Sequence, residues 1–300
     1  MKPTHHPCQK ETLRIGVIGV GLLGSALAER LISAGYHVAG YDPRSFHVSA
    51  VQVAESVPEL IQGSDVLFLS LPSSSVVSEV VRAHVAAFRR GHVVMDTTTG
   101  DPDQMMELHA WLKEREVSYL EANIAGSSQA MRSGDVTLFL GGEPSIIRAH
   151  EDLITSLSPK FFHMGPVGMA SRFKLVHNLV LGLHRLVLAE GLEFARSLGI
   201  DPEHALDILM KTPAFSSVME TKGPSMVHRD YDPPKARLVQ HLKDVRLMLG
   251  QAQATGAHVP LTSIHARLLG EAVRDGLGDM DNSAIVELFR KDHSKENPDG

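Results

Sequence analysis

The chain has 300 residues, of which 43% are hydrophobic and 21% are charged, a composition typical of globular proteins with a sizeable core. This excludes a disordered chain, a fibrous chain and a disulfide-stapled miniprotein, and at ~100–200 residues per domain the length predicts about two domains. With 29 Lys and Arg against 35 Asp and Glu, the formal net charge is −6. A mildly acidic chain has no overall field that attracts phosphate backbones, so nucleic-acid binding is disfavoured.

The first twelve residues, MKPTHHPCQKET, are polar and show neither an apolar stretch nor a small-residue cleavage site. We expect them to form a flexible leader. Cys8 is the single cysteine, so an intramolecular disulfide is impossible. His5 and His6 have no third ligand nearby in the sequence, and we expect no metal there. A reducing, cytoplasmic environment is predicted.

The longest apolar stretch of the chain covers residues 179–189 and is interrupted by His184 and Arg185. It is much shorter than the ~20 residues that span a bilayer. The sequence therefore predicts no membrane association.

The first half of the chain alternates short apolar segments with helix-length segments. Strands are predicted at residues 14–19, 37–42, 65–71, 93–96, 118–122, 137–140 and 161–164. Segments that are apolar on both faces suit strands covered by helices on both sides. Strands separated by helical patterns favour parallel crossover units. We therefore predict an α/β fold that starts with a doubly wound parallel sheet.

After about residue 168 only helical spacing remains. We predict one long helix, or two nearly continuous ones, over 170–198, and further helices at 203–210, 234–255, 261–275 and 282–291. Asp201-Pro202 marks a helix start, with Asp as N-cap and Pro at the first helical position. The predicted division is a leader at 1–12, a sheet domain at 13–167, an all-helical domain at 168–292 and a loose tail at 293–300.

A glycine-rich turn joins the first strand to the helix predicted at Ser25–Ala34. Gly19-Val20-Gly21-Leu22-Leu23-Gly24 fits the pattern G-x-G-x-x-G. In this pattern Gly19 permits a tight turn, Gly21 lets a pyrophosphate approach the backbone, and Gly24 lets helix and strand pack closely. The helix N-terminus supplies N–H groups and a positive dipole end for the phosphates. The segment predicts a Rossmann-type dinucleotide site.

Asp42 ends the second strand, 23 residues after Gly19. A carboxylate at this point accepts hydrogen bonds from both ribose hydroxyls and repels a 2′-phosphate, which favours NAD. Arg44 weakens that preference because a guanidinium accommodates the phosphate. We expect NAD as cofactor, with NADP as the alternative.

With the segments that follow, the chain resembles the β-hydroxyacid dehydrogenase family, which includes 3-hydroxyisobutyrate dehydrogenases and tartronate semialdehyde reductases. The resemblance runs from about Leu13 to Arg290. Leu71-Pro72 resembles the family's LP turn under the cofactor. Asp96-Thr97-Thr98-Thr99, followed by Pro102, resembles its D-x-S-T-x-x-P segment, in which Thr99 would contact the cofactor. Both segments end strands, where an open sheet of this type binds its ligand.

The segment Glu121-Ala122-Asn123-Ile124-Ala125-Gly126-Ser127 is similar to the family's substrate loop, D-A-P-V-S-G-G. Gly126 is kept, and its N–H is expected to donate to a substrate carboxylate. Ala125 replaces the usual serine, and a lost donor to a charged group is worth about 1.5–3 kcal/mol, so we expect an altered substrate choice. Ser127 and Ser128 are expected to supply a hydroxyl from a shifted position. The resemblance thus implies Ala125, Gly126 and Ser127 as substrate-binding residues.

Gly165-Pro166-Val167-Gly168, followed by Lys174 and Asn178, resembles the family signature G-x-x-G-x-G-x-x-x-K-x-x-N-N. Ala170 stands for the third glycine and His177 for the first asparagine. The family implies Lys174 as general acid/base and Asn178 as its partner on the reacting hydroxyl, with Lys174 also touching substrate. Their i, i+4 spacing puts both on one helix face. Outside this motif, the better explanation would be a lysine that reaches solvent from an otherwise apolar helix and an asparagine packed against a neighbour.

Two later segments complete the resemblance. His241-Leu242-Lys243-Asp244 resembles the family's K-D-L segment, which implies that Lys243 reaches the nicotinamide side of the cofactor and that Asp244 orients helices. Asp281-Asn282-Ser283-Ala284 resembles the D-x-S-A opening of the last family helix, for which we expect a capping role.

Taken together, the resemblance implies an NAD(P)-dependent oxidoreductase that interconverts a short 3-hydroxy acid and its semialdehyde or keto acid by hydride transfer. The cofactor would be held by Gly19, Gly21, Leu22, Leu23, Gly24, Asp42, Leu71, Pro72, Thr99 and Lys243. The C-terminal domain would be of the 6-phosphogluconate dehydrogenase type, the assembly a homodimer or homotetramer, and no metal is expected.

Two alternatives stay open. An imine reductase has the same architecture but usually replaces the catalytic lysine. A catalytically inactive NAD(P)-binding regulatory protein would be favoured by loss of Lys174 or Asn178, and both are present.

Overall fold

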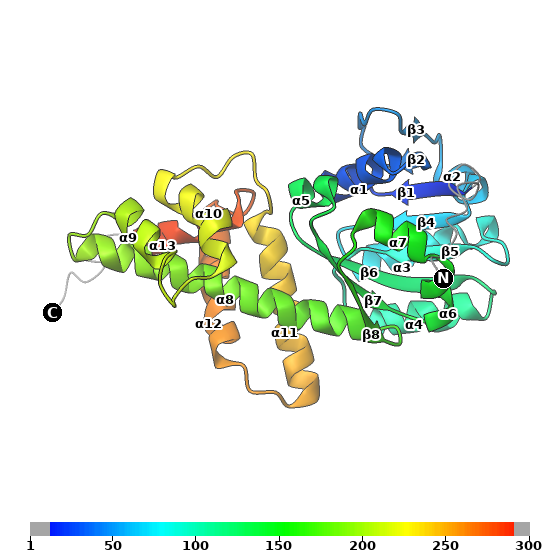
Figure 1. Ribbon diagram of the computed structural model, residues 1–300. Coiled ribbons are helices and arrows are strands. Elements are labelled where there is room, and N and C mark those ends of the chain that lie inside the picture. Colours follow the sequence, from blue (N-terminus) through cyan, green and yellow to red (C-terminus); the bar gives the residue numbers. More distant parts are fainter. Residues whose placement is uncertain (1–12, 291–300) are drawn as a thin grey trace, which may run out of the picture. The chain divides into compact units, whose positions relative to one another are not determined.

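The computed structural model describes residues 13–290, which divide into two compact units after Lys174 (Figure 1). The first unit is built on a β-sheet and the second is helical. The long helix α8 (Met169–Ser197) starts in the first unit and continues into the second. The sequence predicts a boundary between residues 167 and 168, whereas the contacts of residues 169–174 assign this start of α8 to the sheet unit. The predicted leader, with His5, His6 and Cys8, and the predicted tail at 293–300 lie outside the described residues.

One eight-stranded sheet forms the first unit, in the order β3-β2-β1-β4-β5-β6-β7-β8. The strands are β1 (Arg14–Ile18), β2 (His37–Tyr41), β3 (Gln52–Val53), β4 (Val66–Leu69), β5 (Val93–Asp96), β6 (Ser118–Ala125), β7 (Thr137–Gly141) and β8 (Phe161–Gly165). The predicted doubly wound α/β architecture is confirmed. The sequence did not predict β3, because two residues are too few to show a pattern.

The sheet is parallel throughout except between β6 and β7, which run antiparallel. The expectation of parallel units alone was therefore wrong at this pair. Residues 126–136 connect the two strands and hold only the short helix α5 (Ser128–Ser133). A parallel crossover needs about a dozen residues or more, so this connection favours an antiparallel return.

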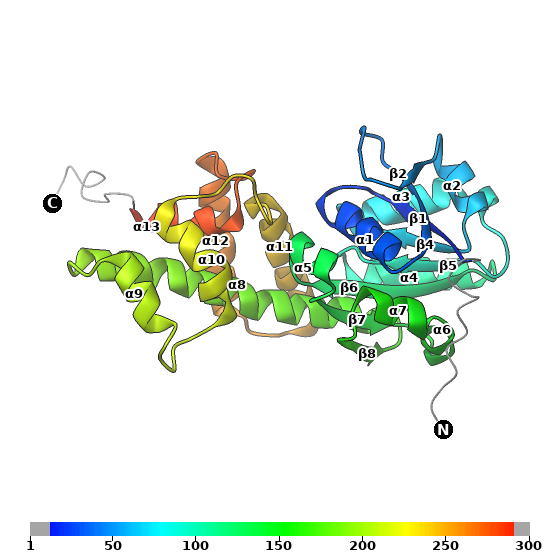
Figure 2. The ribbon, with the colours of Figure 1, turned by 45° about the horizontal axis from the view of Figure 1, so that its top comes forward.

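Helices cover both faces of the sheet (Figure 2). One face carries α1 (Leu22–Ser33), α5, α6 (Pro144–Ala149) and α7 (Glu151–Leu157), and the other carries α2 (Val57–Gly63), α3 (Ser74–Ala83) and α4 (Pro102–Lys113). Alternate residues of one strand point to the two faces. In β4, for example, Phe68 belongs to the core under α1, and its neighbour Leu67 belongs to the core under α4.

The second unit contains the rest of α8 and the helices that follow. These are α9 (Pro202–Leu209), α10 (Ser217–His228), α11 (Leu238–Thr255), α12 (Pro260–Arg274), the 3-10 helix η3 (Asn282–Val286) and α13 (Glu287–Arg290). The predicted helix at 282–291 is thus a 3-10 helix followed by one α-helical turn, and α11 starts later than predicted. Helix α10 was not predicted because it contains Gly223 and Pro224. Gly223 faces α9 so closely that a Cβ there would lie 2.6 Å from Leu206 Cδ1.

Helix α8 is the one helix among residues 13–290 that is long and apolar enough to cross a membrane, judged by length and composition alone. The apolar stretch noted at 179–189 lies inside this longer helix. Such a helix is a weak indication, since core helices of soluble proteins pass the same test. Leu175, Leu188 and Leu192 of α8 are buried in the core of the helical unit.

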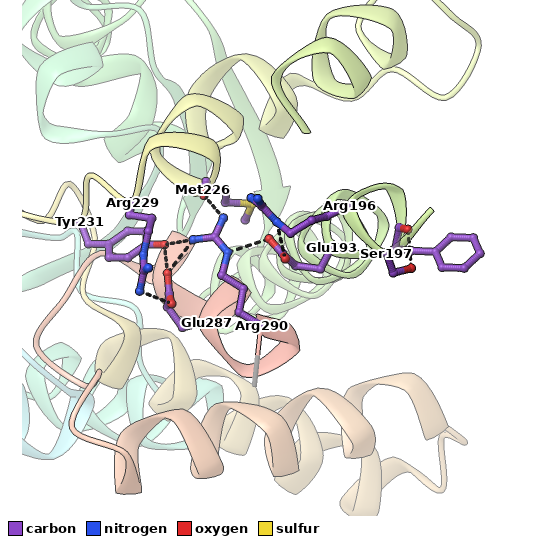
Figure 3. Close-up of polar contacts among 9 residues, drawn as sticks. Glu193, Arg196, Ser197, Met226, Arg229, Tyr231, Glu287 and Arg290 are labelled. Atoms are coloured by element: carbon purple, nitrogen blue, oxygen red, sulfur yellow. Dashed lines mark hydrogen bonds and ion pairs between the residues drawn. The ribbon is translucent and has the colours of Figure 1, made fainter. Parts of the chain in front are cut away.

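Arg290 fastens three segments of the helical unit together (Figure 3). Its guanidinium donates to Glu193 of α8 (2.7 Å), to Glu287 of α13 (2.8 Å) and to the carbonyl of Met226 in α10 (2.7 Å). The Tyr231 hydroxyl also donates to Glu287. The Arg290 side chain is only 13% exposed. Its positive charge is therefore stabilised mainly by these partners and only slightly by water. They hold the C-terminal turn of the described chain against α8 and α10.

Candidate cofactor and substrate site

The glycine-rich turn between β1 and α1 has the shape that a pyrophosphate needs. Gly19 has a φ of 92°, and a Cβ there would lie 2.4 Å from the Ser70 carbonyl oxygen. At Gly24 a Cβ would lie 1.9 Å from the Gly19 carbonyl oxygen, so only glycine fits at both positions. Gly21 has open space beside it, since the nearest atom to an added Cβ is Nη2 of Arg44 at 3.7 Å.

The start of α1 suits an anion for a second reason. Gly21 is its N-cap and makes no side-chain hydrogen bond, and its first turn, which lies within the described residues, holds no acidic side chain. The helix dipole and the first N–H groups are therefore not neutralised by a carboxylate. Gly19, Gly21, Leu22, Leu23 and Gly24 together fit the phosphates of a dinucleotide.

Asp42 lies at the end of β2 with its carboxylate directed at this turn. It accepts hydrogen bonds from the N–H of Val20 (3.0 Å), the N–H of Arg44 (3.0 Å) and Nε of Arg44 (3.2 Å). Burial raises the pKa of Asp42, but the bonds and charge of Arg44 outweigh it, and the pKa lies below its usual value. Asp42 is thus held ionised with a guanidinium at its side, in the place where a ribose is expected.

The carboxyl ends of β4, β5 and β6 are tied together by side chains. Thr98 Oγ1 accepts from the N–H of Leu71 (3.1 Å), and the Asn123 amide donates to the Thr98 carbonyl (2.9 Å). These bonds fix the edge of the sheet on which Pro72 and Thr99 lie, so the predicted cofactor residues of the first unit share one edge. Asn123 was not predicted as a member of this edge.

A buried carboxylate, Asp96, supports the same edge from beneath. It is 1% exposed, accepts from the Tyr119 hydroxyl (2.6 Å) and the Thr98 N–H (2.9 Å), and pairs in register with Glu121 on the next strand. Burial raises the pKa of Asp96 to about 6, against the opposing effect of the hydrogen bonds from Tyr119 and Thr98. Asp96 orients the turn that leads to Thr99.

Lys174 lies next to the predicted substrate loop. It is 7% exposed, and its Nζ donates to the carbonyl oxygen of Ile124 at 2.7 Å. Ile124 directly precedes Ala125, Gly126 and Ser127, so the structure brings together the lysine and the loop that the sequence singled out. Gly126 has a φ of 155° and faces Val136 so closely that a Cβ would lie 2.6 Å from Val136 Cγ1, which requires glycine.

Ser127 has a structural role that the sequence did not predict. Its Oγ accepts from the N–H of Ala130 (3.1 Å) and caps α5. The hydroxyl proton of a capping serine stays available for donation. The shifted donor proposed from the sequence is therefore compatible with the cap.

Asn178, Lys243 and Asp244 belong to the helical unit. The Asn178 amide donates to Asp244 Oδ2 (3.0 Å), and Lys243 pairs with Asp244 Oδ1 (3.1 Å). His177 contacts Asn178 Oδ1 through its Nδ1 (3.1 Å). Asp244 thus fixes the side chain of Asn178, one helical turn after Lys174 on α8, which agrees with the orienting role expected for this aspartate.

Asp281 caps η3, as its motif suggested. Its carboxylate accepts from the Ser283 N–H and hydroxyl and from Lys222 Nζ (2.8 Å). Burial raises the pKa of Asp281, but the charge of Lys222 and the hydrogen bonds from Lys222 and Ser283 outweigh this effect and lower the pKa to about 2.

Glu121 is a functional candidate that the sequence-based reasoning passed over. It is 1% exposed, and its carboxylate accepts hydrogen bonds from the N–H groups of Gly168, Ala170 and Ser171 and from the Ser171 hydroxyl. Burial raises the pKa of Glu121, and the hydrogen bonds oppose this effect. The sequence feature that could have indicated this role is the single acidic residue within the predicted buried strand SYLEA.

Two family models match the chain. Residues 14–165 match the NAD binding domain of 6-phosphogluconate dehydrogenase, and residues 168–289 match the NAD-binding domain of NADP-dependent 3-hydroxyisobutyrate dehydrogenase. The chain belongs to the β-hydroxyacid dehydrogenase family. The family resemblance noted from the motifs is confirmed, and so is the expectation of an NAD(P)-dependent oxidoreductase.

Known members of the β-hydroxyacid dehydrogenase family align along most of this chain. It is 25% identical over 291 residues to 2-(hydroxymethyl)glutarate dehydrogenase of Eubacterium barkeri, covering 94% of this chain and 96% of the relative. It is 26% identical to 2-hydroxy-3-oxopropionate reductase of Escherichia coli, covering 92% and 97%. The structure of Mycobacterium tuberculosis 3-hydroxyisobutyrate dehydrogenase with L-serine has a TM-score of 0.83 at 25% identity, covering 93% of this chain and 99% of that one.

Proposed function

We propose that this β-hydroxyacid dehydrogenase interconverts a short 3-hydroxy acid and its semialdehyde or keto acid, with Lys174 as general acid/base. The hydrogen bond from Lys174 Nζ to the Ile124 carbonyl carries the proposal, because it holds the amine beside the Ala125–Ser127 loop. Relatives named for 2-(hydroxymethyl)glutarate and for 2-hydroxy-3-oxopropionate support a small, anionic hydroxy acid as substrate.

The substrate carboxylate is assigned to the loop. A carboxylate takes hydrogen bonds from N–H and O–H donors, and the Gly126 N–H and the Ser127 hydroxyl are the donors proposed here. Ala125 offers no hydroxyl in its side chain. We therefore propose a substrate whose carboxylate needs one donor fewer than a serine-containing loop provides, or whose larger body fills the space of that hydroxyl.

The proton of the substrate hydroxyl is assigned to Lys174. When bound, NAD(P) supplies the hydride acceptor, and the residues that would hold it are those of the glycine turn together with Asp42, Leu71, Pro72, Thr99 and Lys243. As the C–H bond is broken, the hydroxyl must lose its proton, and a positioned amine takes it; in the reverse direction the ammonium returns it. Asn178 follows one turn later on α8, oriented by Asp244, and is proposed to hold the same oxygen.

We also propose a homodimer or homotetramer. Several large apolar side chains of α8, α9 and the segment between them are exposed in the single chain, namely Val187, Phe194, Leu198, Ile200 and Ile208. Exposed apolar side chains grouped in this way are typical of surfaces that another subunit covers. A cytoplasmic location remains our proposal from the cysteine content.

The test is turnover of a panel of short 3-hydroxy acids with NAD and with NADP by the parent protein and by Lys174→Ala. We expect the substitution to lower kcat by at least about 100-fold and to leave the cofactor dissociation constant within about twofold. Lys160→Ala is the matched control, because Lys160 pairs with Asp135 on the surface of the same unit.

A near-normal rate in Lys174→Ala would contradict the assignment of the base. If the parent protein binds NAD or NADP but oxidises no acid of the panel and reduces no semialdehyde, the inactive regulatory alternative is favoured instead. Turnover of cyclic imines in place of hydroxy acids would favour the imine reductase alternative.

A further inference from the structure

Strand β6 holds the start of α8 at two points. Near its middle the Glu121 carboxylate binds the first turn of the helix, and three residues later the Ile124 carbonyl binds the Lys174 amine. Both contacts bridge about fifty residues of sequence and lie within the sheet unit. The helix that carries Lys174 is therefore fixed to the same strand that leads into the substrate loop.

Glu121 satisfies the N-terminus of α8 almost alone. Helix starts leave N–H groups without intrahelical partners, and a carboxylate there is favoured by both hydrogen bonding and the helix dipole. Glu121 Oε2 accepts from the N–H of Gly168 (2.8 Å) and Ala170 (3.3 Å), and Oε1 accepts from the N–H of Ser171 (3.2 Å) and from its hydroxyl. Ser171 precedes Lys174 by a single helical turn.

The neighbouring strand β7 leaves room for the contact between Glu121 and the start of α8. Gly141 on β7 pairs in register with Glu121. A Cβ at Gly141 would lie 2.1 Å from Glu121 Oε2 and 3.2 Å from the Ala170 nitrogen. A side chain at this position would therefore displace the carboxylate from the helix, so the contact depends on a second residue that is remote in sequence.

We propose that Glu121 is a positioning residue for the reaction: its carboxylate fixes the N-terminal turn of α8, and with it the Lys174 amine, against the substrate loop. The inference rests on the proposed role of Lys174. A misplacement of about 1 Å can cost a reaction about 100-fold. Loss of the anchor is thus expected to lower kcat. Cofactor binding is expected to stay unchanged, because the proposed cofactor residues of the sheet unit follow β1, β2, β4 and β5 instead of β6.

A double-mutant cycle tests the proposal. In Glu121→Gln one carboxylate oxygen becomes an NH2 group, which cannot accept from the N–H donors of the helix start, and the negative charge is lost, so the anchor is weakened at nearly constant volume. We expect kcat to fall by about 10- to 100-fold, with KM and cofactor affinity within about threefold. In the Lys174→Ala background the same substitution is expected to change kcat by less than about threefold, because a residue that acts through Lys174 has no effect once the amine is absent.

Gly141→Ala breaks the same contact while Glu121 is kept, and it carries the test if Glu121→Gln does not fold. We expect a loss of kcat in the same direction and of about tenfold or more, again absent in the Lys174→Ala background. Gly63→Ala at the end of α2 is the matched control, since a Cβ there meets no atom within 4 Å.

The outcomes separate the two proposals. If Lys174→Ala keeps its rate, the proposed function fails. If Lys174→Ala is inactive but Glu121→Gln and Gly141→Ala react normally, the function stands and the positioning role is overturned. If either substitution lowers kcat by the same factor with and without Lys174, Glu121 acts on something other than the amine, and the positioning role is equally overturned.

Discussion

Arg44 decides, in our interpretation, how well the enzyme accepts NADP, and its replacement by alanine is the sharpest test of the cofactor site. Arg44 pairs with Asp42 through Nε (3.2 Å), yet its side chain is 77% exposed. Exposed ion pairs are worth about 0.2–1 kcal/mol because water screens them. The guanidinium can therefore leave Asp42 at small cost.

A 2′-phosphate offers Arg44 more than Asp42 does. A hydrogen bond to a charged group is worth about 1.5–3 kcal/mol, so exchanging the exposed pair for one phosphate contact favours NADP binding by about 1–2 kcal/mol. At 1.4 kcal/mol per factor of ten, this predicts that Arg44→Ala weakens NADPH binding by about tenfold. NADH lacks the phosphate, and its dissociation constant should stay within about twofold.

Fluorescence titration of NADH and NADPH against the parent and Arg44→Ala measures both constants. Arg14→Ala is the control, because Arg14 makes the same kind of partly exposed pair with Asp65 at the start of β1. An equal loss of NADH and NADPH affinity would show that Arg44 supports the turn instead of reading the phosphate. An unchanged NADPH affinity would refute the reasoning altogether.

Two further predictions concern the substrate loop and the helical unit. Ala125→Ser adds a hydroxyl donor beside Gly126. Because a hydrogen bond to a carboxylate is worth about 1.5–3 kcal/mol, kcat/KM for a simple 3-hydroxy acid should rise about tenfold or more. Unchanged selectivity in the substrate panel would mean that the alanine has no effect on substrate choice. His265 is 2% exposed, and burial, followed by the charge of Arg185, lowers its pKa to about 4. The unfolded state therefore binds the additional proton between about pH 6.5 and 4, and lowering the pH from 7 to 5 should cost about 2 kcal/mol of unfolding free energy through this residue. In urea titrations His265→Gln should lose about 2 kcal/mol less than the parent over that range, and equal losses in both proteins would contradict it.

Much of the fold could be predicted because the signals are local. Seven strands and most helices show their hydrophobic period within their own segments, and the glycine turn carries its requirement in adjacent residues. Gly24 needs to be glycine because a Cβ would meet the Gly19 carbonyl of the same turn. Gly19 is favoured locally by its φ of 92°, although the carbonyl that a Cβ would meet there belongs to Ser70 after β4. Helix α10 was missed for a related reason. Gly223 and Pro224 disfavour a helix within their own segment, whereas packing of Gly223 against Leu206 of α9 stabilises it.

The sequence predicted which residues belong to the site better than it predicted which of them form hydrogen bonds with one another. Lys174, Asp42 and the loop at Ala125–Ser127 stand out by motif and spacing. That Lys174 donates to the Ile124 carbonyl, and that Arg44 folds back onto Asp42, follows only from the positions of the backbone in space. The antiparallel return of β7 was missed because strand direction depends on the connection as a whole.

By itself the sequence determined that a sheet domain precedes a helical domain, that a dinucleotide-binding turn follows the first strand, and that a lysine lies on the long helix. Each of these features depends on residues that are close together in the sequence. Only the tertiary structure decided that Glu121 holds the start of α8 and that Gly141 makes room for it. Those residues are separated by twenty to fifty positions and meet because β6 lies between β5 and β7 in the sheet. A carboxylate in an apolar strand has no partner in its own segment, and the order of the strands supplies one.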